Sequence, residues 1–161
     1  MSPTIEKFIK IGQSSSNLLL SLVEDILNLS KMEAGIFAIN MSEFYVKDII
    51  DEIYDMYEQQ LLRKNIELKV DFDESLNGYM IRSDKSRLKQ VLINLMTNSC
   101  KFTFHGYISI LVHVFSSEGN NYIKFCVSDT GIGIKKEDQS KLFKLFGMIK
   151  SNNEGQINPN G

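Results

Sequence analysis

The sequence predicts an α+β protein that begins with a separate, bundle-type helix. Three observations lead to this prediction. Residues 3–34 carry apolar side chains at helical spacing on more than one face. Two further segments with helical spacing, residues 46–62 and 84–99, are interspersed with strand-like segments. The strand-like segments alternate apolar and polar side chains, as half-buried strands do, and they span residues 66–72, 107–115 and 122–129.

The composition limits the possible functions. The chain has 161 residues, enough for one domain and an appended element, and its formal net charge of −2 gives no basic excess for nucleic acid. No apolar run approaches the roughly 20 residues that span a bilayer. We therefore expect no nucleic-acid partner and no membrane contact within this chain. Cys100 and Cys126 lie in core-like contexts, which favours reduced thiols and a cytoplasmic location.

The N-terminal helix has clear end signals. Ser2 is a suitable N-cap, Pro3 fits the first helical position, and Gly35 is a natural stop. Its wide apolar surface requires more than one neighbour, and no second helix of matching length follows. We expect the partner to be another chain or a segment outside this sequence; docking on its own domain is the alternative. The apolar positions are Ile5, Phe8, Ile11, Leu18, Leu19, Leu22, Val23, Ile26, Leu27, Leu29 and Met32.

The next elements alternate between strand and helix. Phe37–Ile39 is a short strand candidate, and a helix is predicted over Val46–Leu62. Ile66–Phe72 reads as a half-buried strand that turns at Asn77–Gly78, so that Tyr79–Ile81 pairs back on it. The buried face of the helix is expected at Val46, Ile49, Ile50, Ile53, Met56, Tyr57 and Leu61.

The following helix carries an unusual set of polar residues. Ser83 is expected to cap it, and Asn94 and Asn98 stack one turn apart, with Lys101 continuing near that face. Asparagine is unfavourable in the interior of a helix, so the presence of two asparagines here needs an explanation. One reading is a solvated face; the other is a Mg²⁺–nucleotide site, in which amide oxygens bind the cation and lysine pairs with phosphate. The buried stripe is expected at Leu88, Val91, Leu92, Leu95 and Met96.

The last predicted strand ends in an Asp–Gly turn. A hairpin is predicted from two strands, Tyr107–Phe115 and Tyr122–Asp129. The second strand ends at Asp129, directly before the turn that contains Gly131 and Gly133. The carboxylate suits an exocyclic amine of a base, and the glycines let the backbone approach a flat ring; an ordinary tight loop is the alternative. A helix over residues 135–146 and a mobile loop over residues 151–161 are predicted to follow.

Taken together, these segments resemble the ATP-binding catalytic domain of sensor histidine kinases, within the GHKL ATPase group. Asp84–Thr103 is similar to the N box and its run-in, and Asp129–Ile134 matches the G1 box. Leu142–Phe146 resembles the F box, and Leu27–Gly35 resembles the end of the second helix of the dimerisation domain. The resemblance implies a two-layer α/β sandwich with helices over one face of a mixed sheet. It also implies a dimerisation helix over residues 1–36 and an ATP-binding domain over residues 37–161.

The resemblance also implies a role for each matching residue. Asp129 would bond the adenine amino group, Asn98 would coordinate Mg²⁺, and Asn94 and Lys101 would face the phosphates. The nucleotide-binding residues implied in all are Asn94, Asn98, Lys101, Phe102, Asp129, Gly131, Gly133, Leu142 and Phe143.

The implied function is the ATP-binding catalytic domain of a two-component kinase. It would transfer the γ-phosphoryl group of ATP, with Mg²⁺, to a histidine. Partners would be a second copy, through the N-terminal helix, and a response regulator or receiver domain. The alternative is a non-catalytic dimerisation or regulatory module. A third option, another GHKL ATPase, is disfavoured by the helix end at Leu27–Gly35.

The sequence departs from the family pattern in three places. An acidic H box with the phosphoacceptor histidine is missing, and we read His105 and His113 as structural. The glycine-rich G2 box stops at Gly161, and Met148 lies near where some relatives place a basic residue. We therefore expect the chain to begin after the acceptor, to have an incomplete lid over ATP and to show no autophosphorylation by itself.

Overall fold

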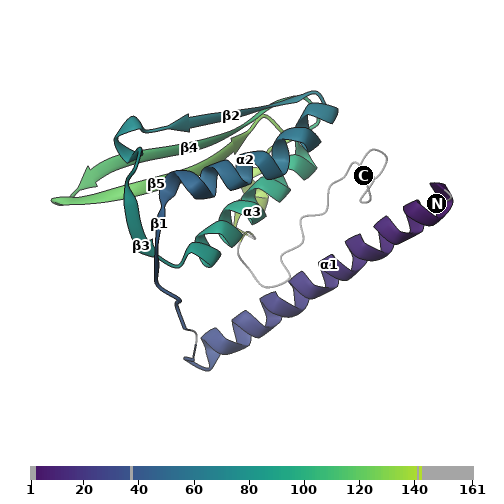
Figure 1. Ribbon diagram of the computed structural model, residues 1–161, viewed down its shortest axis with the longest axis horizontal. Coiled ribbons are helices and arrows are strands. Elements are labelled where there is room, and N and C mark those ends of the chain that lie inside the picture. Colours follow the sequence, from purple (N-terminus) through teal and green to yellow (C-terminus); the bar gives the residue numbers. More distant parts are fainter. Residues whose placement is uncertain (1–2, 37, 141, 143–161) are drawn as a thin grey trace. The chain divides into compact units, whose positions relative to one another are not determined.

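The computed structural model describes residues 3–36, 38–140 and 142 (Figure 1). The chain divides into two compact units, with the boundary between Met41 and Ser42.

The first unit consists of one long helix, α1, which spans Pro3–Glu33. It ends as the sequence predicts: Gly35 has a φ of +67°. The Gly35 N–H donates to the Met32 carbonyl at 3.1 Å, and the Ile36 N–H donates to the Lys31 carbonyl at 3.0 Å. These two bonds are the Schellman pair that satisfies the last carbonyls of a helix. None of the described helices combines the length and apolar character needed to cross a bilayer.

Most of the apolar positions predicted for α1 are exposed; Leu29 is half-buried, and the side chains of Leu18 and Leu22 lie outside the described part of the structure. Phe8 and Leu19 are each more than 60% exposed. Exposed apolar side chains gathered along one helix mark a surface that another helix can cover. The predicted positions found exposed are Ile5, Phe8, Ile11, Leu19, Val23, Ile26, Leu27 and Met32.

The second unit is an α+β domain. Its elements in chain order are β1 (Ser42–Tyr45), α2 (Val46–Arg63), β2 (Ile66–Phe72), η1 (Glu74–Leu76), β3 (Met80–Ser83), α3 (Lys85–Phe102), β4 (Gly106–Ser117), β5 (Asn120–Asp129) and α4 (Lys136–Gln139).

The main sheet is mixed, as predicted. Its strand order is β2–β4–β5, in which β2 runs parallel to β4 and β4 runs antiparallel to β5. Helices α2 and α3 lie together on one face of this sheet (Figure 1). From that face of β4, Ile108, Ile110 and Val112 are fully buried. The two-layer α/β sandwich is therefore confirmed.

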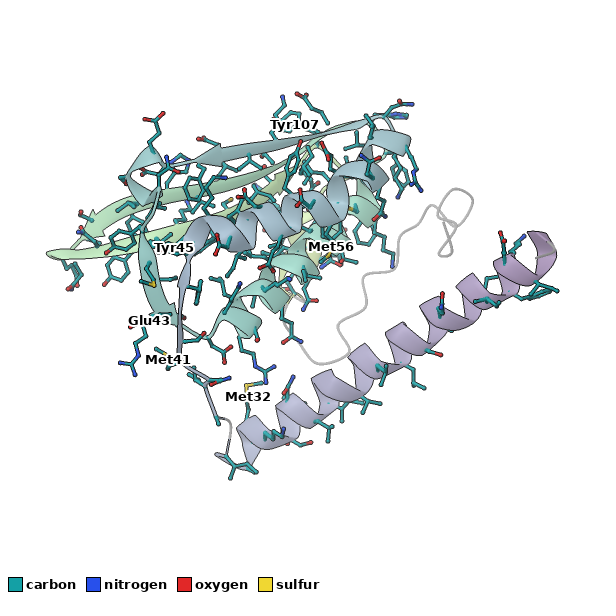
Figure 2. The ribbon with its side chains drawn as sticks, in the orientation of Figure 1. Met32, Met41, Glu43, Tyr45, Met56 and Tyr107 are labelled. Atoms are coloured by element: carbon teal, nitrogen blue, oxygen red, sulfur yellow. The ribbon has the colours of Figure 1, made fainter. Side chains whose placement is uncertain are left out.

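The core lies between the two helices and the sheet. Burial of side chains of this size contributes about 1.5–3 kcal/mol each relative to exposure. Three predicted core positions are wrong: Met56 (labelled in Figure 2), Val91 and Leu95 are each more than 40% exposed. The apolar arc of each helix is wider than the part that the sheet covers. The buried hydrophobic residues of the helices are Val46, Ile49, Ile50, Ile53, Tyr57 and Leu61 of α2 and Leu92, Met96 and Cys100 of α3.

Two strand predictions before α3 are also wrong. Residues 38–40 form no strand, and Phe37 lies outside the described residues; the strand is instead β1, which buries Phe44. The turn at Asn77–Gly78 does not fold β3 back on β2. The short helix η1 intervenes, Leu76 is buried, and β3 pairs antiparallel with β1.

The ends of α3 and of the hairpin differ in detail from the prediction. The N-cap is Asp84 rather than Ser83: its side chain accepts a hydrogen bond from the Arg87 N–H at 3.0 Å. The helix continues to Phe102, three residues past the predicted end. The hairpin turn has two residues rather than six, and both Glu118 and Gly119 have positive φ, as in the tight turns that suit twisted strands.

Helices α2 and α3 are linked by polar contacts beside the core. The Glu52 carboxylate accepts hydrogen bonds from the Nζ of Lys85, at 2.9 Å, and from the Nζ of Lys89. The Tyr57 hydroxyl lies 2.8 Å from the Thr97 hydroxyl. The hydrogen bond from Lys89, followed by that from Lys85, lowers the pKa of Glu52 below its ordinary value of 4.5.

Replacing Glu52 with glutamine is expected to lower the free energy of unfolding by about 1 kcal/mol at pH 7, because the ion pairs of Glu52 with Lys85 and Lys89 are partly exposed. Because the folded state depresses the pKa of Glu52, its contribution is present above pH 4.5 and is lost as the pH falls through the folded-state pKa. Urea unfolding at pH 7 and at pH 3 measures this. The difference between the two proteins should shrink at pH 3; an unchanged difference would contradict the assignment. Asp51→Asn, which breaks only the Lys47–Asp51 pair within α2, is the control.

Candidate functional site

The site is built around the turn that follows β5. Asp129 is the last residue of that strand, and it is exposed. Its Oδ1 atom accepts a hydrogen bond from the Gly131 N–H at 2.9 Å, which closes a local turn. Its Oδ2 atom accepts a hydrogen bond from the Ser99 hydroxyl of α3 at 3.0 Å. The carboxylate is thus held by one donor on each oxygen.

Thr130 links the same turn to the start of β4 by hydrogen bonds. Its Oγ1 atom accepts a hydrogen bond from the Tyr107 N–H at 3.0 Å (Tyr107 is labelled in Figure 2) and donates to the His105 carbonyl at 3.0 Å. Its own N–H donates to the Tyr107 carbonyl at 3.2 Å. Gly106 allows this approach, because a Cβ there would lie 2.2 Å from Thr130 Oγ1 and its φ is +98°.

The two glycines of the turn serve different purposes. A Cβ on Gly131 would lie 2.5 Å from the Phe102 carbonyl oxygen and 2.8 Å from Asp129 Oδ1, so this position has no room for a side chain. Gly133 has open space around it but a φ of +66°, which glycine adopts most readily. The Ile132 N–H donates to the same Phe102 carbonyl at 3.2 Å. The turn is therefore packed against the C-terminal end of α3.

The other predicted polar residues lie on α3. Asn94, Asn98 and Lys101 are exposed, and neither amide side chain forms a hydrogen bond with another residue in the described part of the chain. The Lys101 Nζ lies 5.3 Å from the centroid of the Phe102 ring and pairs with no described carboxylate. From Asn94 to Lys101 the helix rises about 10 Å. Within the described part of the chain, α3 therefore presents two amide side chains without hydrogen bonds and one lysine without a carboxylate partner, on the helix whose Ser99 hydroxyl bonds Asp129.

The remaining predicted residues are less fully placed. Leu142 is half-buried, and its N–H donates to the Gln139 carbonyl at 3.2 Å, in the turn after α4. Phe143, Met148 and the predicted loop up to Gly161 lie outside the described residues. Of the helix predicted over residues 135–146, the structure describes a helical part only at Lys136–Gln139, and residues 141 and 143–146 lie outside the described residues.

Exposed apolar side chains flank the Asp129 turn. Ile132 is 57% exposed and Ile134 is 48% exposed. Small-molecule sites bind their ligands through apolar walls and a few fixed polar groups. These two side chains beside the Asp129 carboxylate therefore suit a planar ring system.

Sequence reasoning missed Ser99 and Thr130, which position the turn. A signal for Ser99 does exist: it continues the buried stripe of Leu92 and Met96 at helical spacing, where a hydroxyl requires a partner. Thr103 continues the same stripe; it is buried, and its hydroxyl has no hydrogen-bond partner in the described structure. The pattern therefore selects Ser99, which links α3 to the turn, but it also selects Thr103, which makes no such link in the described structure.

The two histidines have contacts consistent with the structural reading. His105 contributes its carbonyl to Thr130, and His113 Nε2 lies 3.1 Å from Asp71 Oδ2 on the neighbouring strand. Both cysteines are free thiols, and burial raises the pKa of Cys100. A shallow hollow on the hairpin includes none of the predicted site residues; it is lined by His113, Phe115, Tyr122, Ile123, Lys124 and Phe125.

The sequence matches a known family over the region that contains the site. Residues 83–158 match the model of the family described as "Histidine kinase-, DNA gyrase B-, and HSP90-like ATPase". This range begins just before α3 and includes the Asp129 turn.

Individual proteins give the same picture. The chain is 35% identical over 162 residues to hybrid signal transduction histidine kinase B of Dictyostelium discoideum; the match covers 100% of this chain but 8% of that kinase, so the chain spans a small part of its relative. The solved structure of Acinetobacter baumannii histidine kinase AdeS is 27% identical, with a TM-score of 0.67, over 86% of this chain and 66% of that one. Histidine kinase ThkA, in complex with response regulator protein TrrA, is 27% identical, with a TM-score of 0.61, over 89% and 40%.

Proposed function

We propose that this chain, in which residues 83–158 match the model of the histidine kinase-, DNA gyrase B- and HSP90-like ATPase family, is the ATP-binding catalytic domain of a two-component histidine kinase. The observation that carries the proposal is the attachment of the Asp129 turn to α3. The Ser99 hydroxyl and the Phe102 carbonyl join an exposed carboxylate to the helix that presents Asn94, Asn98 and Lys101. One compact surface thus offers an acceptor for a base and ligands for a charged phosphate chain.

Asp129 binds the adenine end of ATP in this proposal. Its carboxylate accepts two protein hydrogen bonds and has lone pairs left for the exocyclic amine of adenine. The backbone at Gly131 and Gly133 forms the floor of the site, and the exposed Ile132 and Ile134 side chains provide apolar surface for the ring. Leu142 and Phe143 contribute to the same end, as the family resemblance implies.

In this proposal, the phosphates and Mg²⁺ bind along α3. The Asn98 amide oxygen is exposed and has no hydrogen-bond partner in the described part of the chain, so it is available as an oxygen ligand of the kind that a hard cation prefers. Bound Mg²⁺ would neutralise part of the phosphate charge. Asn94 and Lys101 then orient the phosphate oxygens by hydrogen bonding and by charge, and Phe102 packs beside them.

The phosphoryl acceptor is proposed to be a histidine other than His105 and His113. Positioning and charge neutralisation are the main demands of phosphoryl transfer, and the α3 residues supply both. A second copy of the chain is the proposed partner of the exposed apolar surface of α1. A response regulator or receiver domain is the proposed recipient of the phosphoryl group; the structurally similar ThkA was solved with such a protein.

A non-catalytic dimerisation or regulatory module is the second candidate. The exposed apolar side chains of α1 favour it, because they would associate whether or not ATP binds. The two candidates differ in one property: only the first requires that the second unit bind Mg²⁺-ATP.

Calorimetric titration of the chain with ATP, with Mg²⁺ and with EDTA, tests the proposal. We expect tighter binding with Mg²⁺, and we expect Asn98→Ala to lose that gain, about tenfold or about 1.4 kcal/mol. Gln60→Ala, which removes an exposed amide from α2, should behave as wild type. An unchanged Mg²⁺ dependence in Asn98→Ala would reject the metal assignment, and a wild-type chain that binds no ATP would favour the regulatory module.

A further inference from the structure

Ser99 is a buried hydroxyl that the family resemblance leaves without a role. It is 6% exposed, and its Oγ atom lies 3.0 Å from Asp129 Oδ2, across thirty positions of sequence. The other carboxylate oxygen, Oδ1, accepts a hydrogen bond from the Gly131 N–H at 2.9 Å. Among the described residues these are the two donors to Asp129.

The chemistry of the pair fixes the direction of the hydrogen bond. An ionised carboxylate only accepts, so the Ser99 hydroxyl must donate to Asp129. With one donor on each oxygen, rotation of the carboxylate about its Cβ–Cγ bond would break both hydrogen bonds. Without Ser99, the Gly131 N–H alone would hold the group, and either oxygen could take that bond. Ser99 therefore sets the plane of the carboxylate.

The lone pairs that remain are acceptors in a fixed direction. A carboxylate has about four acceptor positions, and two are occupied by Ser99 and Gly131. Asp129 is exposed, so the other positions are available to a ligand. A base with an exocyclic amine satisfies them, whereas a base with a carbonyl at that position places an oxygen against a fixed acceptor. Sites built for one hydrogen-bonding group reject its opposite strongly.

We propose that Ser99 is a positioning residue that sets base specificity: its hydroxyl orients Asp129 so that the site selects a 6-amino purine over a 6-oxo purine. This inference rests on the proposed function, because it assumes that Asp129 meets the base. Ser99 touches Asp129 and not the nucleotide, so its effect on affinity depends on whether the base carries the amine.

The test measures the affinity of Ser99→Ala for three nucleotides with Mg²⁺: ATP, inosine triphosphate, which has a 6-oxo group, and purine riboside triphosphate, which has neither group. We expect Ser99→Ala to bind ATP about tenfold more weakly, the effect of disturbing a hydrogen bond to a charged group. Its affinity for purine riboside triphosphate should stay at the wild-type value. The preference for ATP over inosine triphosphate should fall by about the same factor of ten.

Two further variants make the result specific. Ser116→Ala removes another serine hydroxyl that bonds a side chain, Asn121 Oδ1 at 2.6 Å, at the opposite end of the hairpin; it should match wild type for all three nucleotides. Ser99→Thr keeps the hydroxyl and should keep the preference for ATP, even if the added methyl group weakens all binding equally.

The outcomes separate this inference from the proposed function. Equal losses for all three nucleotides in Ser99→Ala, or no loss for any, would overturn the positioning role and leave ATP binding intact. A wild-type chain that binds no nucleotide would overturn the proposed function, and this inference with it.

Discussion

Replacement of Asp129 by asparagine is expected to weaken ATP binding by about 10- to 150-fold. A hydrogen bond to a charged group contributes about 1.5–3 kcal/mol, which corresponds to that range. Asparagine has almost the same shape, and its oxygen can still accept the Gly131 N–H. Its amide NH₂ would then take the place of Oδ2, which accepts from Ser99 in the wild-type chain. The site would present donors where adenine needs an acceptor. Calorimetric titration with Mg²⁺-ATP measures the change.

Asp71→Asn is the matched control for that substitution. Asp71 is also an exposed strand carboxylate, but its partner is His113. Its replacement should leave the affinity for ATP at the wild-type value. Equal affinity of wild type and Asp129→Asn would reject the adenine assignment, provided that both proteins unfold at similar temperatures.

Replacement of Gly131 by alanine is expected to remove measurable ATP binding. The added Cβ would lie 2.5 Å from the Phe102 carbonyl oxygen, a backbone atom that cannot move by itself. The turn must therefore shift away from α3, which weakens the Ile132–Phe102 hydrogen bond and displaces Asp129. Inserting a methyl group where there is no space typically costs about 1–3 kcal/mol. Urea unfolding should show this cost, and titration should show the lost affinity.

Gly119→Ala separates the local clash from a general loss of stability. Gly119 also has a positive φ, of +78°, but a Cβ there would meet nothing within 4 Å. Its replacement should cost about 1–2 kcal/mol of stability from the backbone conformation alone. The affinity for ATP should remain, because the hairpin turn lies at the other end of β5 from Asp129. ATP binding by Gly131→Ala at wild-type affinity would contradict the site geometry.

The elements that could be predicted from sequence are those with long periodic patterns. Strand β2 has the predicted bounds, Ile66–Phe72, because four apolar residues alternate with charged ones. Helices α2 and α3 and the β4–β5 hairpin were predicted with ends within a few residues. The mixed sheet followed from the family resemblance and is confirmed.

The short elements could not be predicted, because tertiary contacts decide them. Strand β1 turns one of its four side chains, Phe44, into the core, which is too weak a pattern to recognise. The Asn77–Gly78 pair is a common hairpin signal, but η1 precedes it in the chain: Asp73 accepts hydrogen bonds from Ser75, and Leu76 is buried. Burial of a leucine side chain outweighs a local turn preference.

The candidate site shows the same division. Motif spacing selected Asp129, Gly131, Asn98 and Lys101 as candidates, but it predicted no contact between the turn and the helix. That contact depends on the Ser99 hydroxyl and the Phe102 carbonyl. Because every residue has a backbone carbonyl, a sequence pattern does not show which carbonyl accepts a hydrogen bond. The predicted end of α3 was also too early, so Lys101 and Phe102 were expected beyond the helix that carries them.

The most direct test of the central claim maps where Mg²⁺-ATP meets the chain. In ¹H–¹⁵N spectra of the labelled chain, titration with Mg²⁺-ATP should shift the amide resonances of Asn98, Lys101, Gly131 and Ile132 along one binding curve. The resonances of Glu118 and Gly119, in the hairpin turn, should stay in place. Shifts confined to residues other than those of α3 and the Asp129 turn, or no shifts at saturating nucleotide, would contradict the proposal that these two elements form one ATP site.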